Sequence, residues 1–347
     1  MSRVVQTVQG PVPAEELGIV LPHEHLFNDL SSCVAEPTYR FSRAITDREV
    51  DATVQWALKQ DPYCCADNVA PKDVEAVSRE AAAFQAIGGA TIVDATGSAQ
   101  IGRNPQRLLE LSERTGLHVV MSTGAYLEKF EGERITARSV DAMAEEILAD
   151  IREGADVGGR QVRAGMIGEV GISPFFTEGE RASLRAAALA QKETGTALNI
   201  HMPGWQRRGD EVLDIVVDEM GADPSRVSLA HSDPSGEDVH YQKHLLERGV
   251  WLEFDMIGLD ITFPGEGISP SIDQTADAVA GLIEMGYAKQ ILLSHDVFLK
   301  QMWSHLGGNG FVLVPTVFLE LLQARGVDEA TTRALVTDNP QRCLGGA

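Results

Sequence analysis

The segment Leu21-Pro22-His23-Glu24-His25-Leu26 carries two histidines separated by one residue. In an extended strand, residues two apart project to the same face, so His23 and His25 would aim both imidazoles at one point while Glu24 faces away. Two nitrogen ligands on one rigid strand make half of a metal site. Because His-x-His also occurs by chance on protein surfaces, the interpretation depends on which residues lie downstream.

Four more residues of metal-ligating type end apolar, strand-like segments further along the chain: Glu169, His201, His231 and Asp296. Taken singly, a histidine at a strand end is usually hydrogen-bonded structure, and an aspartate there usually caps a helix. Taken together with the first pair, four imidazoles and two carboxylates suit two borderline divalent ions such as zinc, with one acid bridging them. Water held between two such ions becomes hydroxide near neutral pH, which is a nucleophile for hydrolysis.

A repeating order of helix, glycine and strand would position these residues. Helices are expected at residues 73–87, 105–115, 136–153, 179–194, 207–220, 238–248 and 271–285, and the strands that follow them at 90–95, 118–123, 164–170, 197–201, 227–231, 250–255 and 290–295. With the strand that carries His23 this makes eight strands, and such alternation gives parallel βαβ units. We therefore predict an α/β fold, a single (β/α)8 TIM-barrel domain over residues 1–347, with a doubly wound open sheet as the alternative.

The N-terminal part before this repeat is harder to interpret. Residues 4–8 and 17–21 flank a turn region rich in glycine and proline, which predicts a short hairpin ahead of the first barrel strand. Residues 31–71 contain a helical stretch near 47–59 and are expected to form an insertion that covers the mouth of a site.

The C-terminal part is expected to pack as extra helices, at residues 313–325 and 328–336, with Asn339-Pro340 as a stop. In a barrel of this kind, catalytic residues belong at the C-terminal ends of the strands. The six ligand-type residues lie at five such ends, which favours one shared metal site over six separate structural roles.

An ordered set of motifs accompanies these strands. It comprises Leu21-Pro22-His23-Glu24-His25-Leu26, Gly89-Ala90-Thr91-Ile92-Val93-Asp94, Gly102-Arg103-Asn104-Pro105, Ser122-Thr123-Gly124-Ala125-Tyr126, Ala230-His231-Ser232-Asp233, Leu293-Ser294-His295-Asp296, Gly307-Gly308-Asn309-Gly310 and Asp338-Asn339-Pro340. Over nearly its full length the chain thereby resembles the phosphotriesterase-related family of the amidohydrolase superfamily. The resemblance implies a binuclear metal hydrolase, with His23, His25 and Asp296 on the more buried ion and His201 and His231 on the more exposed one.

Two departures from the family pattern matter. Better-known members bridge the metals with a carbamylated lysine, whereas the matching strand here reads Gly168-Glu169-Val170-Gly171, so Glu169 would be the bridge, as in a recognised subset. After the seventh strand, Met256 stands where lactonases commonly have arginine and phosphotriesterases histidine. The metal-bridging hydroxide would attack the substrate, and Asp296 would take its proton and pass it to the leaving group.

Residues around the metals complete the predicted site. With Asp296 and the metal ligand His231, the catalytic set includes Asp233 as a proton relay, with a helix-cap or surface role as the alternative. Substrate contacts are expected from Tyr126, Trp205, Arg207 and Met256; the alternatives are rim packing for Tyr126 and solvated loop positions for Trp205 and Arg207.

The substrate expected first is a lactone or other carboxylic ester, because ring-opening keeps the leaving alkoxide tethered and Met256 makes an apolar wall. N-acyl or N-formyl amide hydrolysis and phosphotriester hydrolysis are the alternatives within enzymes. A small-molecule binding protein on the same barrel is the alternative outside them, although all six ligand positions carry competent residues.

Composition restricts location and partners. No run of 18 apolar residues and no signal-peptide pattern is readable, so we expect a cytoplasmic protein without a membrane span. The net charge of −22 would repel nucleic acid and anionic membranes, which leaves a small-molecule substrate as the expected partner. Four irregularly spaced cysteines indicate reduced thiols. We also expect a homodimer.

Overall fold

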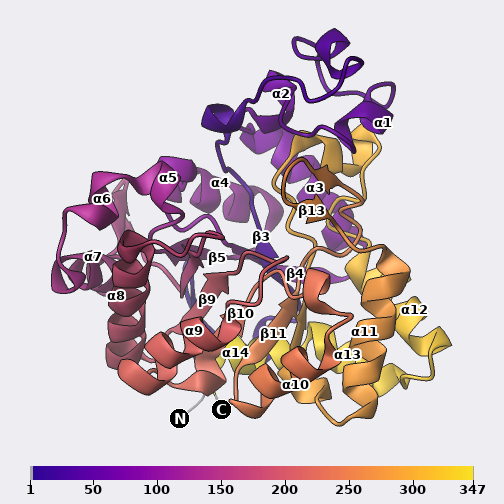
Figure 1. Cartoon of the computed structure of the whole chain (residues 1–347). Helices are drawn as coiled ribbons and strands as arrows, with labels where there is room; N and C mark the ends of the chain where they lie inside the picture. The colour runs from indigo at the N-terminus through magenta and orange to yellow at the C-terminus, as the bar shows by residue number, and fades with distance from the viewer. Residues whose placement is uncertain (1–2, 347) are drawn as a thin grey trace.

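Eight short, apolar, parallel strands form the centre of the molecule in the computed structural model, which describes residues 3–346 (Figure 1). They are β3 (Ile19–Glu24), β4 (Gly89–Asp94), β5 (His118–Thr123), β8 (Met166–Gly171), β9 (Ala197–His201), β10 (Val227–Leu229), β11 (Trp251–Phe254) and β14 (Ile291–Leu293). Neighbours in the sheet follow chain order, each strand parallel to the next. Every predicted barrel strand is present, within a few residues of its expected bounds.

The first and last strands meet and nearly close the sheet into a barrel. The His23 amide donates to Ser294 Oγ at 3.2 Å, and the Asp296 amide donates to the His23 carbonyl at 3.3 Å. Between them, the buried Glu24 carboxylate accepts hydrogen bonds from the Ser294 hydroxyl and from the amides of His295 and Val297. The predicted α/β barrel is thus confirmed, and its seam runs beside three of the six ligand-type residues.

Helices surround the barrel, and at most of the principal ones a polar side chain accepts a hydrogen bond from the first turn. The principal helices are α3 (Val74–Ala86), α4 (Pro105–Thr115), α7 (Val140–Arg152), α8 (Glu178–Thr194), α9 (Gly209–Leu213), α10 (Val239–Glu247), α11 (Ile272–Glu284), α12 (Leu319–Ala324), α13 (Glu329–Val336) and α14 (Asp338–Gly345). Thr177 and Glu180 form a capping box on α8, and Gly195, at φ 67°, ends that helix. Apolar faces of these helices pack on the outer faces of the strands.

The N-terminal hairpin differs from its prediction. β1 (Val4–Thr7) pairs with β2 (Gly10–Pro13), while residues 17–21, expected to be the second arm, lie in or just before barrel strand β3. Gly10, at φ 130°, allows a tight turn directly after β1. β1 therefore pairs with the residues that follow at once, and not with residues 17–21. β1 packs beside α14, the last helix of the chain.

The predicted stop at Asn339-Pro340 is wrong, because these residues lie in the first turn of α14. Proline is tolerated there, since the first N–H groups of a helix need no intrahelical acceptor. The two helices expected before it are present, the earlier one as a π-helical turn, residues 314–318, that continues into α12.

Residues 31–71, hereafter the excursion, project beyond the barrel (Figure 1). The helix expected near 47–59 is reduced to α1 (Gln55–Leu58), and a second single turn is α2 (Ala66–Val69). The excursion buries a small core of its own, made by Ile45, Val50, Val54, Ala57, Leu58, Cys64 and Cys65. All four cysteines of the chain are free thiols.

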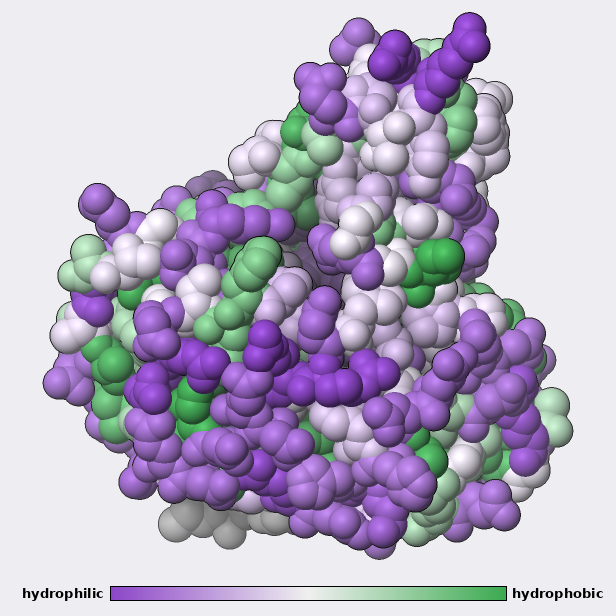
Figure 2. All heavy atoms as spheres, viewed as in Figure 1, coloured by the Kyte–Doolittle hydropathy of each residue, from purple (hydrophilic) through white to green (hydrophobic). Residues whose placement is uncertain are grey.

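Two additional hairpins were not predicted. β6 (Ala155–Val157) pairs with β7 (Arg160–Val162) between α7 and β8, and β12 (Thr262–Phe263) pairs with β13 (Gly267–Ile268) after β11. The second hairpin abuts the excursion, because the Thr262 amide donates to the Lys59 carbonyl at 2.7 Å. Figure 2 shows the surface hollowed beside the resulting projection. Within residues 3–346, no helix is long and apolar enough to span a membrane.

Candidate metal centre

The six ligand-type side chains converge at the C-terminal end of the barrel, and Glu169 lies among them. Its Oε1 is 3.2 Å from His25 Nε2, while its Oε2 lies 3.1 Å from His201 Nδ1 and 3.4 Å from both His23 Nε2 and His231 Nε2. One oxygen of this carboxylate therefore faces His25, and the other faces His23, His201 and His231. A carboxylate that neighbours all four imidazoles in this way could bridge two ions.

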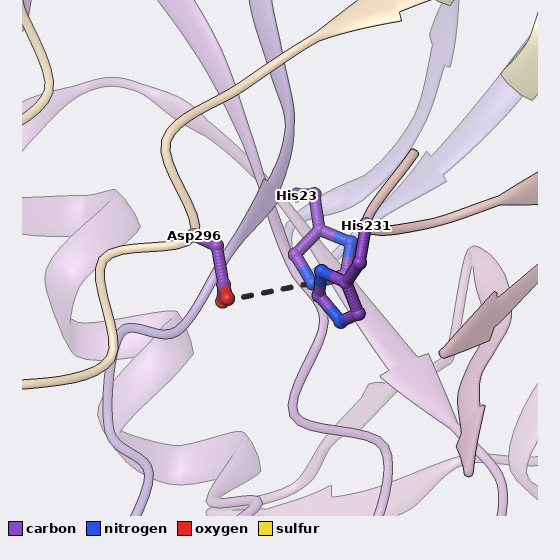
Figure 3. Close-up of side chains that lie close together, drawn as sticks. All are labelled: His23, His231 and Asp296. Carbon is purple, nitrogen blue, oxygen red and sulfur yellow. Dashed lines mark ion pairs between the residues drawn. The ribbon is translucent and has the colours of Figure 1, made fainter. Parts of the chain in front are cut away.

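Asp296 completes the cluster from β14. Its Oδ1 is 3.3 Å from His25 Nε2. The same oxygen lies 3.8 Å from His23 Nε2, the ion pair drawn in Figure 3. His201 is the most exposed of the six, at 19%, whereas His23 is fully buried. One half of the cluster is therefore more accessible than the other.

Unpaired buried atoms test whether this donor set fits metal ions. Both ring nitrogens of His23 and Asp296 Oδ1 are buried without a hydrogen-bond partner among the described residues. Buried polar atoms in folded proteins almost always have a partner, so these atoms indicate a missing ligand. Imidazole nitrogen and carboxylate oxygen are the donors that zinc accepts. The residues fit two ions, one near His23, His25 and Glu169 and one near Glu169, His201 and His231.

Electrostatics show what an ion would replace. Burial opposes protonation of His23, but Asp255, Glu169 and Glu253 outweigh it and raise the pKa of His23 to about 10. His25 behaves alike: burial lowers its pKa, and Asp296 and Glu169 raise it to about 9. Without metal cations, protonated imidazoles would supply the positive charge that balances these neighbouring carboxylates. Since imidazole binds metal only when neutral, metal uptake must release protons and weaken as the pH falls.

Asp255, which follows β11, was not predicted to have a role and supports two of the histidines. Its Oδ1 is 2.9 Å from His231 Nδ1 and also accepts the His231 amide at 3.0 Å, while its Oδ2 lies 3.5 Å from His23 Nδ1. A carboxylate on Nδ1 holds the proton there and leaves Nε2 free as a ligand. Asp255 thereby positions His231 and places a negative charge beside His23.

His25 has a comparable support. Its Nδ1 is 2.8 Å from Thr96 Oγ1, and the Thr96 hydroxyl lies 3.1 Å from Asp94 Oδ1, which also accepts the Leu26 amide. Asp94 ends β4 and Asp255 follows the end of β11, so the signal that would have found both is an acidic residue at a barrel strand's C-terminal end.

Of the predicted substrate contacts, Tyr126 lies at the cluster. The Tyr126 hydroxyl is 3.3 Å from His201 Nδ1, and the two rings meet edge-on with centroids 5.0 Å apart. Burial, with the charges of Glu169 and Asp296, holds the pKa of Tyr126 well above its ordinary value, so the phenol stays a hydrogen-bond donor. Met256 is buried directly after Asp255.

Arg207 and Asp233 make other contacts. The Arg207 guanidinium donates to the Gly204 carbonyl at 3.4 Å and lies over the ring of Tyr241, so the structure does not bring it to the metal ligands. Asp233 is buried and accepts from the Met256 amide and the Thr275 hydroxyl, both at 3.1 Å. Burial and the nearby charge of Asp255 raise the pKa of Asp233 to about 7.

Two other histidines have partners outside the cluster. His244 is exposed and pairs with Asp210 at 2.8 Å, on a helix outside the barrel. His295 Nδ1 is 2.8 Å from Glu24, and its Nε2 accepts the Val314 amide.

Comparison with known proteins agrees with this geometry. The profile described as "Phosphotriesterase family" matches residues 3–344. The chain belongs to the phosphotriesterase family. It is 31% identical to the N-acetyltaurine hydrolase of Rattus norvegicus, an alignment that covers 99% of this chain and 98% of that protein.

Two solved structures show how closely the fold is shared. A resiniferatoxin-binding protein from Rhodobacter sphaeroides superposes with a TM-score of 0.94 at 42% identity, covering 98% of this chain and 94% of that one. A mutant of a PTE-like lactonase from Deinococcus radiodurans gives a TM-score of 0.75 at 28% identity, covering 98% and 100%. This phosphotriesterase-family chain is therefore a hydrolase by family, with a cluster of side chains that could hold metal ions.

Proposed function

We propose that this chain is a binuclear, zinc-dependent hydrolase of carboxylic acyl compounds, with N-acyl amides as the first substrate class and lactones as the second. The observation that carries the proposal is the position of Glu169, whose two oxygens face different imidazoles within 3.4 Å. When bound there, two divalent ions would polarise the scissile carbonyl and lower the pKa of an attacking water.

The protein's own groups supply the proton transfers and the orientation. Asp296 has one oxygen without a hydrogen-bond partner among the described residues, and that oxygen faces the cluster. It is placed to accept the proton of the attacking water and to deliver it to the leaving nitrogen or oxygen. The Tyr126 hydroxyl, beside His201, is placed to donate a hydrogen bond to the substrate's carbonyl oxygen.

The order of substrates differs from the one expected from sequence. N-acetyltaurine hydrolases align with nearly the whole chain at about 30% identity, which supports an amide first. The Deinococcus lactonase supports the lactone, as does the buried, apolar Met256. Phosphotriesters rank last, because methionine cannot relay the proton of a departing group. The name of the Rhodobacter structure supports binding without turnover as the non-enzyme alternative.

A substrate panel on zinc-loaded protein tests this proposal. Purified protein should carry about two zinc ions per chain and hydrolyse an N-acetyl amide or a lactone with kcat/KM at least roughly a hundredfold above paraoxon, or ~2.7 kcal/mol of discrimination. Asp296→Asn serves as the matched inactive control. Absence of acyl hydrolysis in protein that holds two zinc ions would overturn the proposal, and ligand binding without turnover would favour a binding protein.

A further inference from the structure

A buried lysine closes the base of the excursion. Lys72 follows the excursion directly and is only 2% exposed. Its ammonium Nζ donates to Asn28 Oδ1, and Asn28, which lies three residues before the excursion, is equally buried. Beside this bond, the Leu30 amide donates to the Val69 carbonyl at 3.1 Å. The two ends of the excursion are therefore joined where they leave the barrel.

The same ammonium reaches the segment that carries Asp296. Lys72 Nζ donates to the Phe298 carbonyl at 2.7 Å, and Asn28 Nδ2 donates to that carbonyl at 3.0 Å. Phe298 comes two residues after Asp296, and Asn28 three residues after His25. One carbonyl oxygen thus accepts two hydrogen bonds, from residues on both sides of the excursion. Lys72 and Asn28 thereby join the segment after β3 to the segment after β14.

The charge of Lys72 has no direct counter-ion. In the part of the chain that the structure describes, the lysines with a carboxylate oxygen within 4.0 Å are Lys59, Lys243 and Lys300. Both acceptors of the Lys72 ammonium are neutral oxygens. An ammonium that is removed from water destabilises the fold unless acceptors satisfy its N–H groups. Lys72 therefore holds both oxygens firmly, since the loss of either would cost a charge-assisted hydrogen bond.

The backbone at Asp296 requires such support. Asp296 has φ 54°, in the left-handed region that residues other than glycine adopt at a cost. Its amide donates to the His23 carbonyl at 3.3 Å, which is long for a hydrogen bond. The Phe298 carbonyl, held by Lys72, is a second fixed point two residues further on. Between these two points, Asp296 Oδ1 lies 3.3 Å from His25 Nε2.

We propose that Lys72 is a positioning residue for the metal centre: by holding the Phe298 carbonyl, it keeps the Asp296 carboxylate turned toward the ligand-type histidines. Lys72 forms no hydrogen bond to the six ligand-type side chains among the described residues, so it acts through Phe298. This inference rests on the proposed hydrolase and deepens it, because it names the residue that sets the position of the proton acceptor.

Zinc affinity tests the inference. Lys72→Met keeps the length of the side chain but removes its donors, and competition with a chromogenic zinc chelator measures both dissociation constants. Only one constant should weaken, that of the ion beside His25 and Asp296, and by at least about tenfold, as for other groups that support metal ligands. Lys300→Met is the matched control, because Lys300 lies in the same segment but pairs with Asp67 of the excursion.

Kinetics at saturating zinc separate positioning from loss of the metal. In Lys72→Met, kcat for the best acyl substrate should fall at least about tenfold while KM stays within about threefold, because a displaced proton acceptor slows the chemical step more than binding. Asn28→Ala removes the other donor to the same carbonyl. The double variant should therefore lose less than the product of the two single losses.

Amide exchange makes the test independent of zinc and of hydrolysis. The amides of Asp296 and Val297 both donate to strand β3. In apoprotein their hydrogen exchange should be at least about tenfold faster in Lys72→Met than in the parent, and unchanged in Lys300→Met. A parent protein that binds no zinc and hydrolyses no acyl compound, combined with this acceleration, keeps the role of Lys72 and rejects the proposed function.

Two results overturn the inference. One is a folded Lys72→Met protein with unchanged zinc constants and unchanged exchange of these amides. The other is a Lys300→Met protein with the same losses as Lys72→Met, because a lysine that does not reach the Phe298 carbonyl would then serve equally. If Lys72→Met does not fold, Asn28→Ala gives the same readouts, since it also removes a donor to that carbonyl.

Discussion

Asp255→Asn is the substitution that best tests how the metal centre is assembled. The Asp255 carboxylate accepts from His231 through both the ring Nδ1, at 2.9 Å, and the backbone amide, at 3.0 Å, and lies 3.5 Å from His23 Nδ1. Asparagine keeps the shape but replaces one acceptor by a donor, so at least one of these N–H groups faces another donor. An unsatisfied buried donor costs about 1–3 kcal/mol.

Removal of a carboxylate behind a metal-bound histidine typically weakens metal binding by about 10–100-fold. That range corresponds to about 1.4–2.7 kcal/mol and agrees with the hydrogen-bond estimate. Competition with a chromogenic zinc chelator would measure both dissociation constants. Both should weaken, because Asp255 is the hydrogen-bond acceptor of His231 and its charge lies 3.5 Å from His23 Nδ1. Asp260→Asn is the matched control, since Asp260 is exposed and pairs with Lys59. Unchanged zinc affinity at both sites in Asp255→Asn would refute the assignment.

Three further substitutions test neighbouring groups. Glu169→Ala should leave at most about one zinc ion per chain by elemental analysis and lower activity at least about a hundredfold. The parent apoprotein should recover its activity with zinc alone, whereas a need for added bicarbonate would indicate a carbamylated lysine. Burial lowers the pKa of Lys72 to about 7. The folded parent should therefore lose up to roughly 4 kcal/mol of stability between about pH 10 and pH 7, as the unfolded chain takes up a proton that the folded chain refuses, and Lys72→Met should flatten that dependence in urea titrations. Asp233→Asn should destabilise the fold by about 1–3 kcal/mol in the same titrations, yet change kcat less than about threefold. A larger fall in kcat would instead support the proton-relay role predicted for Asp233.

The barrel could be predicted because its signals are local. Each strand is a short apolar run after a glycine, and most helices begin at a polar residue whose side chain accepts from their first turn, such as Ser139 and Ser271. The hairpin partner of β1 could not be chosen in this way. Residues 10–13 and 17–21 both alternate, and only the barrel's need for residues of β3 beside β4 decides between them.

The convergence of the ligand-type side chains was predictable for a related reason. Catalytic residues of a (β/α)8 barrel lie at the C-terminal ends of its strands, so residue type and position sufficed to bring His23, His201 and Asp296 together. Residue type alone did not show which of Asp233 and Asp255 contacts the ring of His231, since both are buried aspartates near it. What separates them is orientation: Asp255 faces the His231 ring, while Asp233 faces the Met256 amide and the Thr275 hydroxyl.

The excursion shows where sequence reasoning ends. Its core is a set of small and medium side chains without helical or strand periodicity, and its fixed points are long-range contacts, such as Gln55 to the Leu306 carbonyl and Asn68 to Gln301. Such contacts have no local signature, yet they determine that Tyr63 meets Phe263. The six ligand-type residues are positioned by the barrel strands, whereas the contacts of the excursion depend on how distant loops pack against it. The proposed metal centre and the surface around it are therefore encoded at different ranges along the sequence, and substitutions in the excursion should leave zinc binding intact.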